Sequence, residues 1–147
     1  MLVRRSVQLP LSADRAWQLL QQWKTFLYVT RGVLAFELED SPPVRFLPGQ
    51  VHRGRLCLAH VVPGWRHELK VVAVDPAKRE IHTNESGGLL RVWNHRLIVR
   101  PLSADTCVYT DEVELDAGWL SWPAWFVAHA VFRYRQARWR RLARQLG

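Results

Sequence analysis

The spacing of hydrophobic and polar residues in the first quarter of the chain predicts a strand, two helices and a second strand. Residues 2–9 alternate between apolar and polar side chains, which is the period of a half-buried strand. Ala13–Gln22 has helical spacing and follows Ser12, a residue type that caps helix N-termini. A second short helix is expected over Trp23–Val29, and a strand over Gly32–Leu38.

The middle of the chain has a strong β pattern. Turn sequences separate five strand candidates: Gln50–Val62, Trp65–Val74, Glu80–Glu85, Leu89–Arg100 and Thr106–Leu115. The first separator is Pro63-Gly64, and all of them are short enough to join antiparallel neighbours. Trp119–Leu146 is then predicted to form one long helix, with Pro123 near its start, where the missing N–H costs least.

The predicted order is therefore strand, two helices, six strands and a long terminal helix. An antiparallel sheet with one apolar face must bury that face, and the terminal helix can cover it. We expect an α+β fold in which a curved antiparallel sheet of about seven strands is wrapped around the C-terminal helix. The 147 residues, 48% of them hydrophobic, fit one domain spanning residues 1–147.

Three segments of the second half resemble the START-like superfamily, also called SRPBCC or helix-grip. They are Gly87–Pro101 (GGLLRVWNHRLIVRP), Thr110–Gly118 (TDEVELDAG) and Phe132–Ala143 (FRYRQARWRRLA). They are similar to the ending of bacterial polyketide cyclase/dehydrase-like members of uncharacterised role. The resemblance implies a helix-grip fold whose cavity, between sheet and helix, holds an apolar or amphipathic small molecule. Because this superfamily hosts unrelated functions, the resemblance says more about fold than about activity.

The last two predicted strands supply candidate cavity residues. In Leu89–Arg100, the odd-numbered face includes Trp93 and His95. In Thr106–Leu115, the odd-numbered face includes Tyr109 and is apolar except for Asp111. If both faces are concave, a three-residue turn about Ser103 places His95 directly opposite Asp111, with Cβ atoms about 5 Å apart. A buried carboxylate needs such a hydrogen-bond partner.

This pair has two interpretations. It is either a satisfied core pair that fixes the strand register, which is the favoured interpretation, or a functional pair. A functional pair would bind a ligand hydroxyl or carbonyl group, or act as general acid and base. Arg135 lies in the packing stripe of the terminal helix, and its guanidinium is expected to reach solvent. The alternative is contact with Asp111 or with an acidic group of a ligand.

The predicted terminal helix changes character along its length. Its second half has one apolar stripe with arginines on the other faces, whereas its first half is apolar nearly all round. The first half therefore needs a cover, which could be a subunit, a membrane, the preceding loop or a ligand. Candidate ligand contacts here are Trp122, Trp125, Phe126 and His129. Four further tryptophans are expected only to pack: Trp17, Trp23, Trp65 and Trp139.

The net charge of +8 is concentrated in the same helix, because residues 119–147 contain six arginines and no acidic residue. A solvated basic face is the favoured interpretation. A nucleic-acid surface is not expected, since the aromatic residues lie away from most of the arginines. No nucleotide-binding or hydrolase motif, no metal-ligand spacing among the six histidines and no CxxC motif is present. We therefore expect no cofactor, metal or disulfide.

These observations together favour a ligand-binding protein. It would bind a hydrophobic or aromatic small molecule, of polyketide, isoprenoid, quinone or lipid type, in the cavity. One alternative is a polyketide cyclase/dehydratase-like enzyme in which His95, oriented by Asp111, acts as acid and base. The other is a basic-helix module that contacts a membrane or an acidic partner. Without a signal-peptide pattern or a bilayer-spanning run, the expected compartment is the cytoplasm, and the chain would be a monomer or homodimer.

Overall fold

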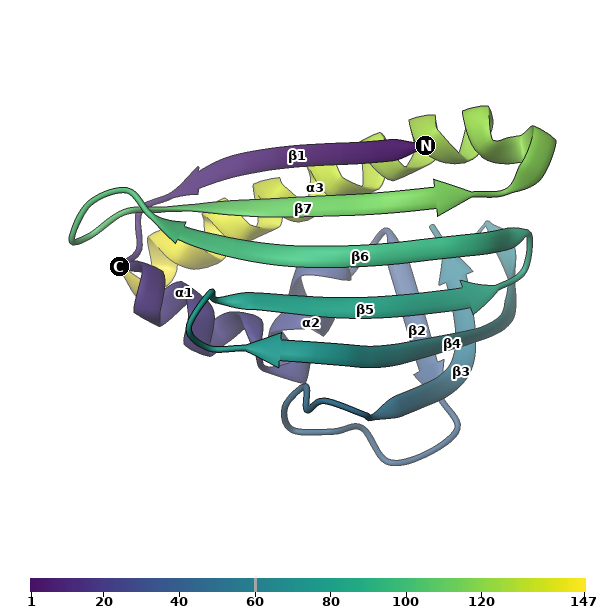
Figure 1. Cartoon of the computed structure of the whole chain (residues 1–147), viewed down its shortest axis with the longest axis horizontal. Helices are drawn as coiled ribbons and strands as arrows, with labels where there is room; N and C mark the ends of the chain where they lie inside the picture. The colour runs from purple at the N-terminus through teal and green to yellow at the C-terminus, as the bar shows by residue number, and fades with distance from the viewer. Residues whose placement is uncertain (60) are drawn as a thin grey trace.

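The computed structural model, which describes residues 1–59 and 61–147, confirms the predicted order of elements (Figure 1). The first half contains β1 (Leu2–Leu9), α1 (Ala13–Leu20), α2 (Trp23–Thr30), β2 (Leu34–Leu38), β3 (Val51–Leu58) and β4 (Val62–Asp75). The second half contains β5 (Glu80–Gly87), β6 (Leu90–Pro101), β7 (Cys107–Asp116), a 3₁₀ turn (Gly118–Leu120) and α3 (Ser121–Leu146).

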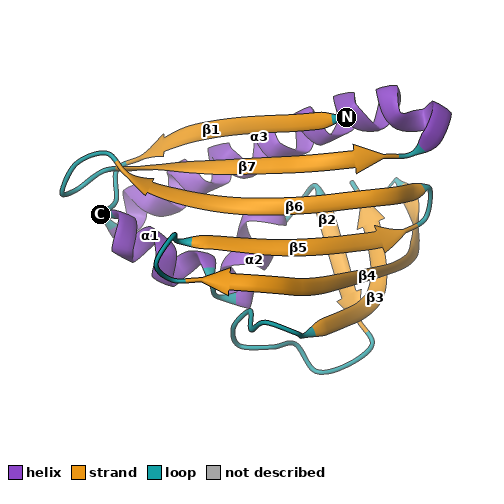
Figure 2. Cartoon of the chain, in the orientation of Figure 1, coloured by secondary structure: helices purple, strands orange, loops and turns teal. Residues whose placement is uncertain are grey.

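The seven strands form one curved antiparallel sheet in the order β1-β7-β6-β5-β4-β3-β2. Figure 2 shows the three α-helices on one side of this sheet. The longest helix, α3, runs along the sheet beside β1 and β7 (Figure 1). This is the predicted helix-grip arrangement, and its core lies between the concave face of the sheet and the helices.

The long terminal helix is held to the sheet by one continuous face. Its buried apolar residues are Ala128, Val131, Phe132, Trp139 and Ala143, with buried Arg135 and Gln136 in the turn between Phe132 and Trp139. This is the spacing of one helical face, so every turn of α3 from Ala128 to Ala143 contributes a buried side chain. The Trp139 ring lies 5.2 Å from the ring of Tyr109 on β7. Among the described residues, no helix is long and apolar enough to span a bilayer.

The pairing of β6 with β7 differs from the predicted register by two residues. His95 pairs with Val113 and not with Asp111. The predicted parity is correct, because the odd-numbered residues of both strands do face the same side. The connecting loop is longer than predicted: the Thr106 carbonyl accepts from both the Leu102 and Ser103 amides at 3.0 and 3.1 Å.

Two predicted boundaries are also corrected. Pro63-Gly64 lies inside β4, which begins at Val62, and is not a separator. A Cβ atom at Gly64 would lie 2.3 Å from Cγ of Arg55 on β3, so the glycine here makes room for a crossing side chain. The chain reverses earlier, where Ala59 has a φ of 50°. The preceding strand, predicted to run to Val62, ends at Leu58, and His60, within the predicted range, lies outside the described residues.

The terminal helix begins two residues later than predicted. Gly118 has a φ of 60°, in the left-handed region that interrupts a right-handed helix. The Asp116 carboxylate accepts from the Gly118 amide at 2.7 Å, and the Ser121 hydroxyl accepts from the Ala117 amide at 2.9 Å. These side chains satisfy backbone donors of a 3₁₀ turn, so α3 starts only at Ser121.

The contrast between two tryptophans gives a test of this packing. Trp139 is 1% exposed and Trp119 is 86% exposed. Trp139→Ala should lower the free energy of unfolding by about 3–5 kcal/mol, because it leaves a cavity under α3. Trp119→Ala should change it by about 0.5 kcal/mol or less. Urea denaturation of both variants measures the difference, and equal effects would contradict the packing described.

Candidate functional site

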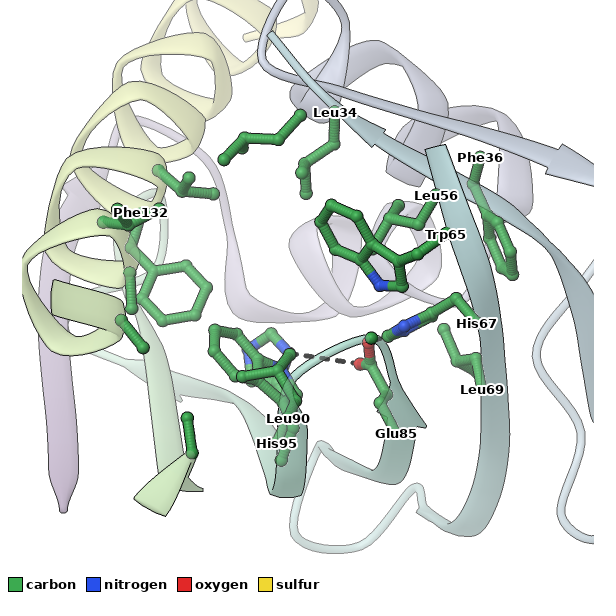
Figure 3. Close-up of a pocket in the computed structure, with 18 of the residues that line it drawn as sticks. Leu34, Phe36, Leu56, Trp65, His67, Leu69, Glu85, Leu90, His95 and Phe132 are labelled. Carbon is green, nitrogen blue, oxygen red and sulfur yellow. Dashed lines mark hydrogen bonds and ion pairs between the residues drawn. The ribbon is translucent and has the colours of Figure 1, made fainter. Parts of the chain in front are cut away.

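A cavity of about 470 Å³ lies between the concave face of the sheet and α3. Figure 3 shows α3 on one side of this space and the strands on the other. Most of its wall is apolar and includes Leu34, Leu56, Trp65, Leu90, Trp93 and Phe132. The first turns of α3 add further small and aliphatic side chains. An apolar cavity of this size is typical of a small-molecule site.

Polar side chains are gathered in one part of this wall. They are His67, Thr83, Glu85, His95 and Arg135. The first four come from neighbouring strands β4, β5 and β6, on which alternate residues point to the same face. Thr83 pairs directly with His95 across β5 and β6. Strand register therefore places these groups together, and α3 adds Arg135 from the other side.

The Glu85 carboxylate is at the centre of this polar group. It accepts hydrogen bonds from His67 Nε2 and Thr83 Oγ1, each at 3.0 Å. His95 Nδ1 lies 3.8 Å from Glu85 Oε1, as the dashed line in Figure 3 marks. Burial opposes ionisation, but the contacts with His67 and His95 outweigh it and lower the pKa of Glu85 to about 2. Glu85 is therefore an anion at neutral pH.

His95 lies between two carboxylates. Its Nε2 is 3.1 Å from Oδ1 of Asp111, and its Nδ1 faces Glu85. Burial lowers the pKa of His95, but the interactions with Asp111 and Glu85 outweigh that effect and raise it. The imidazolium form is favoured, with an N–H group directed at each carboxylate. A ring in that form donates hydrogen bonds and has no lone pair with which to accept a proton.

The predicted contact between His95 and Asp111 is therefore present, although the two residues are diagonal neighbours. Asp111 is fully buried and lies behind the cavity wall. Its Oδ1 also accepts from the Tyr109 hydroxyl at 2.7 Å, and its Oδ2 accepts from Gln136 Nε2 at 3.3 Å. Burial opposes ionisation of this carboxyl, but the nearby charges of Arg135 and His95 hold its pKa low.

Arg135 does not reach solvent, so the favoured sequence interpretation is wrong. Its side chain is buried, Nη2 donates to the Tyr109 hydroxyl at 3.2 Å, and the same nitrogen lies 3.6 Å from Asp111 Oδ1. The reason is the fully buried carboxylate of Asp111, whose negative charge attracts the guanidinium inward. The two carboxylates of the cluster, Glu85 and Asp111, thus face two cationic groups, His95 and Arg135.

The structure separates the nine predicted ligand contacts into three groups. Three line the cavity: Trp93, His95 and Arg135. Two stand behind its wall and hold the His95 and Arg135 side chains: Tyr109 and Asp111. The other four do not line it: Trp122, Trp125, Phe126 and His129. Helix geometry explains this for Trp122 and Phe126, because at 3.6 residues per turn both project from the side of α3 opposite the cavity-lining Ala124 and Val131.

Trp125, predicted to contact a ligand in the cavity, instead packs against the edge of the sheet. Its indole N–H donates to the carbonyl of Leu2 on β1 at 3.1 Å, and its ring lies 4.1 Å from that of His129. Trp122 and Phe126 pack at the edges of the same indole ring. These aromatic side chains therefore lie on the outer side of α3, near the sheet edge formed by β1.

Sequence reasoning missed much of the cavity wall, including its polar residues His67, Thr83 and Glu85. Trp65, assigned only to packing, borders the cavity, and so do His67 and Glu85. Their signal was available: Trp65, His67 and Leu69 alternate along β4 and share one face. The packing assignments of Trp17, Trp23 and Trp139 are confirmed by their burial.

Unused hydrogen-bonding groups remain beside the cavity. Among the described residues, three buried nitrogens of lining side chains have no hydrogen-bond partner: Trp65 Nε1, His67 Nδ1 and Arg135 Nε. Within residues 1–59 and 61–147, no group of His, Cys, Asp and Glu side chains has the arrangement of a metal site. The three unpaired nitrogens are free to form hydrogen bonds to a molecule in the cavity.

Comparison with solved structures shows a START-like fold. A START superfamily protein from Mycobacterium smegmatis has a TM-score of 0.72 at 14% identity, covering 99% of both chains. Norcoclaurine synthase from Thalictrum flavum, solved with dopamine and hydroxybenzaldehyde, has a TM-score of 0.70 at 14% identity, covering 99% of this chain and 87% of that one. These identities establish the fold and not the activity.

A third similar structure is the di-domain ARO/CYC protein BexL of the BE-7585A biosynthetic pathway. Its TM-score is 0.67 at 16% identity, and the alignment covers 96% of this chain and 45% of that one. A search of curated proteins gives no match. Residues 32–146 match the family model described as "Domain of unknown function (DUF8410)". Since this match spans more than half of the chain, the protein belongs to the DUF8410 family.

Proposed function

We propose that this protein binds an uncharged, largely apolar or aromatic small molecule in the cavity between the sheet and α3. Ligands of this kind include polyketides, isoprenoids, quinones and other lipids, and the protein would act as their carrier or sensor in the cytoplasm. The observation that carries the proposal is an apolar cavity of about 470 Å³ with its polar side chains gathered in one place. Apolar walls bind such a ligand, and a few polar groups orient it.

The charges of the polar cluster favour an uncharged ligand. Each carboxylate has a cationic partner: Glu85 faces His95, and Asp111 faces both His95 and Arg135. A charge moved from water into an apolar cavity is costly unless a partner is free to compensate it. A ligand anion would have to compete with Asp111 for Arg135, and a ligand cation would have to compete with His95 for Glu85.

The spacing of two cluster atoms supports a ligand with a hydroxyl or carbonyl oxygen. His95 Nδ1 and Glu85 Oε1 are 3.8 Å apart, which is beyond ordinary hydrogen-bond length. A ligand hydroxyl can accept from the His95 N–H and donate to Glu85, while a carbonyl can use the N–H alone. A polar ligand atom placed there would improve the hydrogen bonding of both side chains.

The enzyme alternative uses the same side chains. A polyketide cyclase/dehydratase-like protein would need His95 as acid and base, oriented by Asp111. A protonated ring between two carboxylates can donate to a substrate carbonyl, but a general base needs a free lone pair. A His95 ring held between two carboxylates therefore suits the role of a hydrogen-bond donor to a ligand better than that of a general base.

Ligand binding in the cavity can be tested by filling the cavity with a larger side chain. Val131 lines the cavity from α3, whereas Ala137 is exposed on the same helix. Val131→Trp should weaken binding of Nile red, an uncharged aromatic dye, by about tenfold or more, because the larger side chain occupies the ligand's space. Ala137→Trp should leave the affinity unchanged. Fluorescence titration measures both, and native mass spectrometry of the purified protein identifies any ligand already bound.

Circular dichroism of each variant must first show a folded chain. If Val131→Trp does not fold, Ala124→Trp provides a second cavity-filling variant on the same helix. Equal dye binding by the filled variants and the wild type would place the dye outside the cavity and contradict the proposal.

The polar anchor is tested by pH. Below its raised pKa, the His95 ring carries both N–H groups. As the pH rises through that pKa the ring keeps one N–H, which the shorter contact with Asp111 holds at Nε2, so Nδ1 loses its proton. The affinity for naphthalenemethanol, measured by Nile red displacement from about pH 6 to about pH 9, should therefore fall by about tenfold. Methylnaphthalene, which lacks the hydroxyl group, should show no such fall.

A matched variant separates this effect from general pH sensitivity. His95→Gln keeps a hydrogen-bond donor but has no titrating ring, so the affinity for naphthalenemethanol should become independent of pH over this range. A pH dependence that persists in His95→Gln would show that another group orients the hydroxyl.

A further inference from the structure

The first turns of α3 expose an unusual amount of aromatic surface. Trp122 is 64% exposed and Phe126 is 63% exposed, and both are in contact with the Trp125 ring. Trp119, just before the helix, is more exposed still. Large contiguous apolar patches on a protein surface mark sites where another apolar phase or partner binds. We call Trp119, Trp122 and Phe126 the aromatic patch.

Exposed residues that also line the cavity lie at the same end of the molecule as this patch. On α3 these residues include Val127, directly beside Phe126. Leu89, 71% exposed, comes from the β5–β6 turn, and Val62 from the start of β4. Figure 1 shows the start of α3 and the β5–β6 turn at the same end of the molecule. We call Val62, Leu89 and Val127 the cavity rim.

The charge of the helix indicates the kind of partner. Residues 117–147 contain no acidic residue. Arg133 and Arg140 are exposed and follow Phe126 at intervals of seven, so they lie on the same side of α3 as the aromatic patch. Among the described residues, neither arginine has an ion-pair partner. This face therefore combines an aromatic end with unpaired positive charge.

We propose that the aromatic patch and the cavity rim dock on an anionic lipid bilayer, with the arginines of the same helix face toward the headgroups. Tryptophan is suited to the bilayer interface because it combines an apolar ring with one N–H donor. Apolar insertion together with attraction between arginine and anionic lipid is the pattern of a peripheral membrane surface. The docked protein would open its cavity toward the apolar phase of the bilayer.

A second copy of the chain fits this surface less well. It would cover the aromatic rings with the same face, which has no acidic residue on its helix to pair with Arg133 or Arg140. An anionic bilayer supplies both an apolar interior and negative charge. The membrane contact goes beyond the proposed ligand binding, and its test needs no ligand.

Vesicle flotation of the purified protein provides that test. The probes are phosphatidylcholine vesicles with and without phosphatidylglycerol. Wild-type protein should float with the anionic vesicles, and added salt should reduce this binding. The double variant Trp122→Ser, Phe126→Ser should bind them about tenfold more weakly. Leu102→Ser removes an exposed apolar side chain from the β6–β7 turn, at the other end of the sheet, and should bind like the wild type.

The arginine contribution is tested separately. Arg133→Gln with Arg140→Gln should weaken binding to anionic vesicles and reduce its salt dependence, because two charges near the headgroups are lost. All the substituted side chains are exposed, so the variants should keep the wild-type unfolding free energy.

Three outcomes would overturn the membrane proposal. The first is wild-type protein that stays with neither kind of vesicle. The second is equal flotation of the wild type and the Trp122→Ser, Phe126→Ser variant. The third is wild-type protein that does not float but forms a dimer in analytical ultracentrifugation, while the Trp122→Ser, Phe126→Ser variant is a monomer. That result would assign the patch to a second copy of the chain.

Discussion

The burial of one carboxylate, that of Asp111, organises the centre of this protein. A fully buried charge is tolerated only where several partners compensate it, and Asp111 has them from three directions. His95 comes from β6, Tyr109 from β7, which also carries Asp111, and Arg135 and Gln136 from α3. These partners tie the long helix to the sheet at a defined place along its length. Gln136 extends the tie to β1, where it donates to the Arg5 carbonyl at 2.8 Å.

The same constraint shapes the cavity. Because Asp111 holds one side of the His95 ring, the other ring nitrogen is directed toward Glu85, which His67 and Thr83 also hold. The ionised groups are thereby confined to one part of the wall, and their charges compensate one another there. The remaining wall is free to be apolar. A cavity of this kind binds a ligand with one polar end more readily than a ligand with polar groups along its length.

Much of the fold followed from sequence, but the site followed only in part. Alternation and turn residues identified the seven strands, and the odd faces of β6 and β7 were assigned correctly because strand parity survives a register shift of two residues. The exact register of β6 and β7 depended on loop length, because a longer β6–β7 turn made His95 and Asp111 diagonal neighbours. The side of α3 that faces the cavity could not be deduced from its all-apolar first half. The inward turn of Arg135 depended on a carboxylate on another element.

The polar cluster and the exposed apolar rim lie at different depths of the same cavity. The polar cluster is buried among β4, β5, β6 and α3, whereas exposed Leu89 and Val127 border the cavity at its rim. A ligand that satisfies both would therefore place its polar atom inward, near Glu85 and His95, and its apolar end at the rim. An uncharged molecule with that division also partitions into lipid bilayers, with its polar atom near the headgroups. The rim and the cluster thus impose compatible requirements on one class of ligand.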